Sequence, residues 1–154
     1  MNICIGVGFD DIILGMRPDK VISKLGEPDK INETEYEGDT IYYYNDQMIK
    51  YSFSKDESNK LMSITCYNNE CKLYGNYIIG KKKSDIIELL KNNNISKFEY
   101  DYYDTFDIVY CEEINTYFEV IFDKIVNIEI GVLYHKDKDE IIWPLLINEK
   151  DNDI

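Results

Sequence analysis

The stretch LGMRPDKVISKLGEPDKI, residues 14–31, decides the fold that this sequence predicts. Its apolar residues Val21, Ile22 and Leu25 have the i, i+1, i+4 spacing of a short helix that lies with one side on a sheet. Gly26 follows them directly, and glycine is the commonest residue just past the end of a helix. The stretch therefore predicts one short helix that leads straight into strands.

The same pattern occurs a second time further along the chain. When residues 13–25 (ILGMRPDKVISKL) are aligned with residues 78–90 (IIGKKKSDIIELL), Gly15 falls on Gly80 and the later apolar positions coincide. Runs of aromatic and β-branched residues follow each helical segment, and turn-forming residues separate these runs, which is typical of antiparallel hairpins. A short helix followed by a β-meander is thus predicted twice.

We expect an α+β protein in which two tandem helix-plus-antiparallel-meander units share a mostly antiparallel sheet, with the helices on one face. The chain of 154 residues is long enough for a single domain, 1–154, with units at 3–70 and 71–134 and a C-terminal extension at 135–154. The residues expected in the core are Val21, Leu25, Ile49, Tyr51, Phe53, Ile64, Ile86, Leu90, Phe118, Val120, Phe122, Ile128 and Ile130.

The extension contains one apolar run, EIIWPLLI, at residues 140–147. Charged residues flank this run on both sides, and Pro144 limits it to the edge of a sheet or a bulge. We expect an edge strand or a clamp across the sheet, with Trp143 in the core.

The first helical stretch resembles the signature of the β-lactamase inhibitor protein-like fold, which also occurs in small outer-membrane assembly lipoproteins. The residues that carry the resemblance are Gly15, Met16, Val21, Leu25, Gly26 and Pro28. The second copy keeps the glycine and the apolar positions, but has asparagines at 92–94 where Gly and Pro would fall. The resemblance implies a helix-plus-meander fold that binds other proteins and catalyses nothing. It also implies an immunity protein, because stand-alone cytoplasmic relatives of this size and acidity often hold a bacterial toxin inactive.

Composition limits the classes of partner. With 17 basic and 30 acidic residues, the formal charge is −13, so the chain as a whole repels nucleic acids and anionic membranes and attracts cationic partners. The N-terminus, MNIC, supplies neither a signal peptide nor a lipoprotein signal, and no apolar run approaches the ~20 residues of a membrane span. We therefore expect a cytoplasmic protein. In that reducing compartment the four cysteines are expected to be thiols, and the C-x4-C spacing of Cys66 and Cys71 favours a turn over a zinc site.

The sequence contains no recognisable catalytic or cofactor motif. Its one histidine, His135, lies in the charged segment YHKDKDE, which indicates a solvated loop. The segment GVGFDD lacks the lysine and the third glycine of a phosphate loop, and no acidic loop has the spacing of a calcium site. We expect a protein that is not an enzyme and that has no cofactor or metal.

One segment differs from the rest in its charge. Residues 98–123 contain eight acids and no Lys, Arg or His, and tyrosines lie between the acids. Two interpretations remain open: a soluble outer face, or a docking surface whose carboxylates steer a basic partner while tyrosine rings supply contact area. The candidate partner-binding residues are Glu99, Asp101, Tyr103, Asp107, Glu112, Glu113, Tyr117 and Glu119.

Together these observations predict a bacterial immunity protein that neutralises a cationic toxin by protein–protein contact, with a nuclease as the leading candidate. The alternative is a non-catalytic scaffolding or envelope-assembly module that holds other proteins without inhibiting them. The sequence leaves open the identity of the toxin, the oligomeric state, and whether the toxin is bound at its active site or beside it.

Overall fold

The structure is a computed structural model that describes residues 1–34, 38–137 and 139–144. In the first half of the chain the elements are β1 (Asn2–Cys4), β2 (Gly8–Phe9), β3 (Ile12–Ile13), α1 (Pro18–Leu25), β4 (Lys30–Glu33), β5 (Asp39–Tyr44), β6 (Ile49–Ser54) and β7 (Lys60–Cys66). In the second half they are β8 (Lys72–Leu73), β9 (Asn76–Tyr77), α2 (Lys83–Asn92), β10 (Glu99–Tyr102), β11 (Asp107–Cys111), a 3-10 helix (Glu112–Ile114), β12 (Thr116–Ile121) and β13 (Lys124–Gly131). A hairpin of β14 (Leu133–Tyr134) and β15 (Ile141–Ile142) follows.

The largest element is an eight-stranded sheet with the order β10-β11-β12-β13-β7-β6-β5-β4. All neighbouring strands in it are antiparallel, which confirms the expected antiparallel sheet. Each helix is followed by four of these strands, and the two sets meet where β7 pairs with β13. The helices that contain Val21 and Ile86 therefore hold equivalent places in the two halves, and both side chains are buried.

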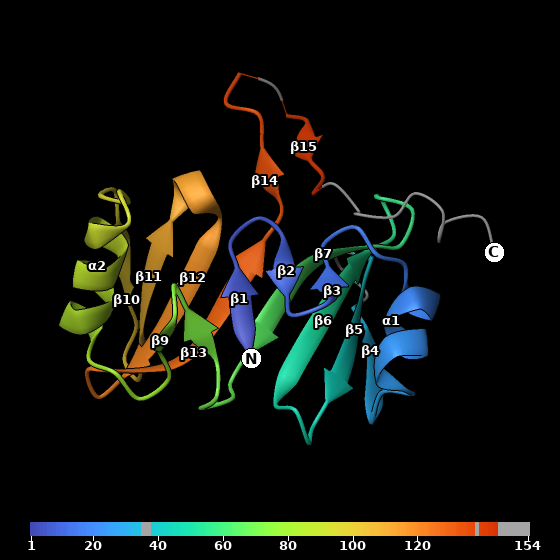
Figure 1. Cartoon of the computed structure of the whole chain (residues 1–154), viewed down its shortest axis with the longest axis horizontal. Helices are drawn as coiled ribbons and strands as arrows, with labels where there is room; N and C mark the ends of the chain where they lie inside the picture. Colours follow the sequence, from blue (N-terminus) through green and yellow to red (C-terminus); the bar gives the residue numbers. More distant parts are fainter. Residues whose placement is uncertain (35–37, 138, 145–154) are drawn as a thin grey trace.

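A second, five-stranded sheet has the order β3-β2-β1-β8-β9, and its β1 and β8 strands are parallel. It lies over the middle of the large sheet, with α2 beside one end and α1 beside the other (Figure 1). Among the described residues, strands account for 44% and helices for 15%.

The expected α+β class with helices covering one face is therefore wrong, because the protein is mostly β. The helices have only 8 and 10 residues, and the small sheet takes the central place where we expected helices.

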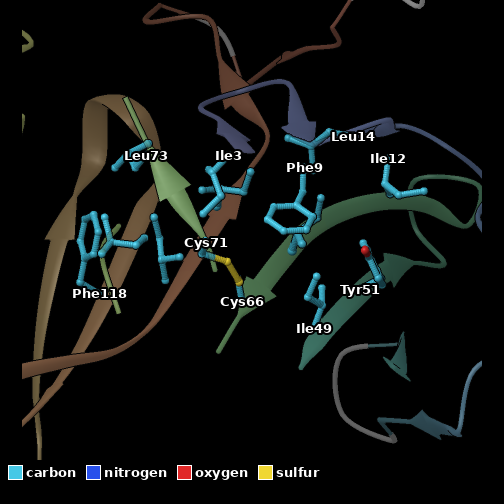
Figure 2. Packing of buried hydrophobic residues seen from close by; sticks show 14 of the residues in the cluster. Ile3, Phe9, Ile12, Leu14, Ile49, Tyr51, Cys66, Cys71, Leu73 and Phe118 are labelled. Carbon is cyan, nitrogen blue, oxygen red and sulfur yellow. A yellow bond between two sulfur atoms is a disulfide. The ribbon is translucent and has the colours of Figure 1, made fainter. Parts of the chain in front are cut away.

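The core lies between the two sheets. Ile3 and Phe9 of the small sheet point toward Ile49 and Cys66 of the large one (Figure 2). Of the residues expected in the core, all are buried except Leu25, which is half-buried, and Phe122.

Phe122 is the one clear error in the expected core, since its side chain is 97% exposed. Counting alternate residues along β12 places Phe122 inward, but β12 ends at Ile121 and a bulge shifts the register between Glu119 and Val120. Phe122 and Asp123 instead form the turn between β12 and β13, with φ angles of 50° and 64°. A bulky residue in this left-handed region is uncommon, because its Cβ crowds the backbone.

We expect the substitution Phe122→Asn to stabilise the protein. Asparagine tolerates a positive φ and is common in two-residue hairpin turns, and the exposed ring gives up no buried area when it is removed. The free energy of unfolding, measured with urea, should rise by about 0.5 to 1 kcal/mol. The matched variant Phe118→Ala removes a fully buried ring from the same strand and should lower it by about 3 to 5 kcal/mol. A loss of stability in Phe122→Asn would mean that the ring makes contacts that its exposure does not indicate.

Cys66 and Cys71 form a disulfide in the centre of the core, so the expectation of four thiols is wrong for this pair (Figure 2). The C-x4-C segment is a short loop that carries the chain from the end of β7 to the start of β8. The disulfide therefore links the large sheet to the small one. Cys4 and Cys111 are free thiols, exposed and buried respectively.

Reduction of this disulfide should destabilise the protein without unfolding it. The bond closes a short loop, for which the chain-entropy model gives about 2 kcal/mol. Urea unfolding with and without a thiol reductant measures this difference, and the variant Cys66→Ala/Cys71→Ala should lose its response to the reductant. If the wild type unfolds identically with and without reductant, the bond contributes nothing to stability.

The chain after β13 returns to the body of the protein. The Trp143 ring packs against Gly15, whose φ of +95° and close approach to the ring leave no room for a Cβ. The Lys60 ammonium lies 4.6 Å from the centre of the same ring. Trp143 is half-buried against the core, and β15 supplies the short strand expected here, whereas residues 145–147 of the apolar run lie outside the described residues.

Candidate functional site

The eight-stranded sheet has one face directed into the core and one face left open by the described helices and the small sheet. The pairing register places one row of side chains on the open face, one from each strand. From β4 to β10 this row is Lys30, Tyr43, Lys50, Thr65, Glu129, Tyr117, Tyr110 and Glu99. The residues next to this row, among them Tyr44, Ile49, Ile128 and Phe118, are buried on the other side, as alternation requires.

Charge is distributed unevenly along the open face. At the β4–β6 end, the ammonium groups of Lys30 and Lys50 lie 5.7 and 5.8 Å from the centre of the Tyr43 ring. At the β10–β12 end the face carries acids, including Glu99 and Glu119. The open face is therefore basic and aromatic at one end and acidic and aromatic at the other.

Five of the eight candidate residues come together on the open face. Glu99 and Tyr117 belong to the row described above, and Asp101 and Glu119 lie in the next row, on either side of Ile108. Tyr103 borders the same part of the face. We call these five residues, at the acidic end of the open face, the acidic patch.

The other three candidates lie elsewhere. Asp107 is paired with Val120, and alternation along β11 directs it to the core side of the sheet. Glu112 and Glu113 belong to the 3-10 helix after β11, where strand alternation no longer applies. Burial is the main cause of the raised pKa of Tyr110, at the margin of the open face, and the charge of Glu112 adds to it. In the same way, burial and then the charge of Glu113 raise the pKa of Cys111.

The acidic patch borders a hollow of about 340 Å³ in the open face. The residues that line it are Lys50, Thr65, Tyr67, Asp101, Tyr103, Ile108, Tyr117, Glu119, Asn127 and Glu129. These residues come from both halves of the chain, because the hollow spans the junction between β7 and β13.

Hydrogen bonds and ring stacking hold this hollow in shape. The Asn127 side-chain amide donates to Glu119 Oε2 over 2.6 Å, and the Thr65 hydroxyl donates to Glu129 Oε2 over 3.5 Å. The Tyr117 ring stacks on Tyr110 with 4.2 Å between centroids. The polar and aromatic groups of the hollow are therefore ordered before any partner binds.

Burial changes the acid–base behaviour of two groups in this region. Burial raises the pKa of the Glu129 carboxyl, and hydrogen bonds from Ser63 and Thr65 and the charge of Lys50 offset only part of this effect. Burial, followed by the neighbouring Tyr117, raises the pKa of Tyr110 to about 12. Glu129 is thus a carboxylate whose charge is poorly solvated in the free protein.

A different hollow, of about 610 Å³, lies between α2 and β10 on the core side of the sheet. Tyr100 and Tyr102 line it with stacked rings, and the Lys83 ammonium lies 5.7 Å from the centre of each. These two tyrosines of the acid-rich segment therefore contribute nothing to the open face.

The central residues of the open face, namely Lys50, Thr65, Asn127 and Glu129, are not among the residues predicted from the sequence. Alternation along β7 and β13 signals that Thr65 and Glu129 point away from the core. What the sequence lacks is a local sign that the two strands are neighbours, since they lie far apart in the chain.

The last candidates to place are His135, considered for catalysis, and groups of His, Cys, Asp or Glu, considered for metal binding. His135 is an exposed residue after β14, and its backbone N–H donates to the carbonyl of Glu140 over 2.9 Å. Within residues 1–34, 38–137 and 139–144, no three His, Cys, Asp or Glu side chains are grouped as metal ligands. Neither of the described helices is long and apolar enough to cross a membrane.

No protein-family model matches the chain, and no curated protein matches it. One solved structure, an extracellular protein containing an SCP domain from Bacillus anthracis str. Ames, is similar with 16% identity and a TM-score of 0.48. The similarity covers 75% of this chain and 43% of that protein, so this chain spans less than half its length. At this level the similarity supports no argument about fold or function.

The raised pKa of Glu129 predicts how stability depends on pH. A carboxyl that ionises less readily in the folded state than in the unfolded state stabilises the fold below its unfolded pKa, and this contribution is lost as the pH rises through the folded pKa. Glu129→Gln cannot ionise, so its stability relative to wild type should increase between about pH 4 and pH 7. Urea unfolding of both proteins across this range measures the difference.

Glu88→Gln on the exposed side of α2 is the matched control for the loss of one charge. If Glu129→Gln becomes less stable than wild type as the pH rises, the carboxylate is stabilising in the folded protein and the expected sign is wrong.

Proposed function

We propose that this protein is an immunity factor that binds a cationic toxin domain, with a nuclease as the leading candidate, and neutralises it. The observation that carries the proposal is the acidic patch. Its acids and tyrosines come from β10, from the residue just after β10 and from β12, and they gather beside a hollow on one side of the sheet. A sheet presents such groups on a rigid surface, which lowers the entropic cost of binding.

Charge explains why a toxin of this kind fits the acidic patch. Nucleases hold phosphates in basic clefts, and an array of carboxylates can occupy such a cleft in place of phosphates or bind beside it. The formal charge of −13 and the local excess of acids favour rapid association with a basic protein. This attraction weakens as salt is added, because the Debye length falls to ~10 Å near 0.1 M salt.

Tyrosine rings supply a different part of the proposed affinity. Tyr103 is 55% exposed and Tyr117 is 37% exposed, so both have ring area that a partner can cover. Tyr103 stacks on Phe106 at 4.7 Å and Tyr117 stacks on Tyr110 at 4.2 Å, which limits the rotamer freedom lost on binding. This contribution should depend little on salt.

The test begins with the partner. The tagged protein is used in a pull-down to recover its partner from a lysate of the cells that produce this protein. The affinity of the purified pair is then measured by surface plasmon resonance at low and high salt. Asp101→Lys and Glu119→Lys reverse charges within the acidic patch, and each should weaken binding about tenfold or more at low salt.

Glu88→Lys makes the same change of charge on α2, which packs on the core side of the sheet, and should leave the affinity within about twofold. If Asp101→Lys and Glu119→Lys are folded and bind as tightly as wild type, the acidic patch is a soluble surface and the proposal fails. A partner that is bound but keeps its full activity would instead support the scaffolding alternative.

A further inference from the structure

Three carboxylates surround the hollow, and two of them are only partly satisfied. Glu119 accepts a hydrogen bond from Asn127, and Glu129 accepts hydrogen bonds from Ser63 and Thr65. The ion pairs found in the described part of the chain lie elsewhere, so neither Glu119 nor Glu129 has a cation within bonding distance there. Asp101 adds a third negative charge at the rim.

Lys50 is the one cationic residue in the described lining, and it is engaged with aromatic rings. Its ammonium lies 5.1 Å from the centre of the Tyr67 ring and 5.8 Å from that of Tyr43, and it hydrogen-bonds to Tyr67. Its charge reaches Glu129 but does not form an ion pair with it. With three carboxylates and one ammonium, the hollow keeps a net negative charge.

We propose that this hollow receives the guanidinium group of an arginine side chain from the partner, with Glu119 and Glu129 as acceptors and the Tyr117 ring as a wall. The inference rests on the proposed function, because it names the group of the toxin that the open face recognises.

Guanidinium fits these surroundings better than ammonium does. It is planar, stacks on aromatic rings, donates several hydrogen bonds in a fixed geometry and is less strongly hydrated. Lysine offers a compact, strongly hydrated charge that gains less from a ring beside it. The poor solvation of the Glu129 charge adds to the argument, since an entering cation would offset the cost of its burial.

The test uses a small probe and the wild-type protein. Acetyl-Gly-Arg-Gly-amide is titrated into the 15N-labelled chain, and chemical shifts are followed up to about 50 mM peptide, because a single side chain binds weakly. The same peptide with lysine tests the shape of the cation, and the peptide with citrulline keeps the shape but removes the charge. We expect saturable shifts at Thr65, Tyr117, Glu119 and Glu129 with arginine, binding about fivefold weaker with lysine, and no saturable shifts with citrulline.

Two variants link the shifts to the carboxylates. Glu119→Gln and Glu129→Gln should each weaken the binding of the arginine peptide about fivefold or more, whereas Glu88→Gln on α2 should bind as the wild type does. If arginine and citrulline shift the same residues equally, if the arginine shifts lie outside the hollow, or if no saturable shift occurs, the inference is wrong. These outcomes come from the wild-type protein, so they hold even if a variant fails to fold.

The experiment also separates this inference from the proposed function. If the arginine peptide binds in the hollow but no toxin depends on the acidic patch, the guanidinium site stands and the immunity role fails. If Asp101→Lys and Glu119→Lys abolish toxin binding but the peptide does not bind, the immunity role stands and the guanidinium site fails.

Discussion

The pairing of β7 with β13 is the contact on which the rest of the structure depends. It joins the two halves of the chain into one sheet, with Glu129 opposite Thr65 and Ile130 opposite Ile64. Ile64 and Ile130 are buried in the core, while Thr65 and Glu129 line the hollow on the open face. Because side chains alternate along a strand, a shift of one residue would exchange the two sets and place a carboxylate in the core. The core and the hollow are therefore fixed by the same register.

This arrangement lowers the stability of the free protein. Glu129 lies in the middle of the sheet, where burial disfavours its charge, and its hydrogen bonds and the charge of Lys50 compensate only in part. A fold selected for stability alone would place an uncharged residue here, as on many half-buried sheet surfaces. Charged groups that remain poorly solvated in the free state are common where a protein meets a ligand. The central position of Glu129 is thus easier to understand as part of a recognition surface than as part of a structural network.

Local patterns in the sequence predict what depends on local contacts. The stripe that includes Val21 and the corresponding stripe around Ile86 predict both helices, and alternation predicts the shared face of Glu99, Asp101 and Glu119. The small sheet was not predicted, because four of its strands have only two residues and show no period. Without that sheet the fold class was misjudged. The central part of the hollow was missed for another reason, since the neighbourhood of β7 and β13 is a long-range contact that no local pattern encodes.

The polarity of the open face adds a constraint on how any partner lies across it. Lys50, on β6, is the residue of the basic end that lies nearest the acidic patch, and its ammonium lies near the Tyr43 and Tyr67 rings and forms no ion pair with a carboxylate of the described residues. A cationic group of the partner is attracted over β10 to β12 but meets a like charge when it is displaced toward β6. For the basic partner proposed above, attraction and repulsion together would set its orientation, and specificity would depend on both. A uniformly acidic face would bind basic proteins in many orientations. On three neighbouring strands, the open face presents a cation, a hydroxyl and a carboxylate in turn, at Lys50, Thr65 and Glu129. This order of groups favours a single orientation.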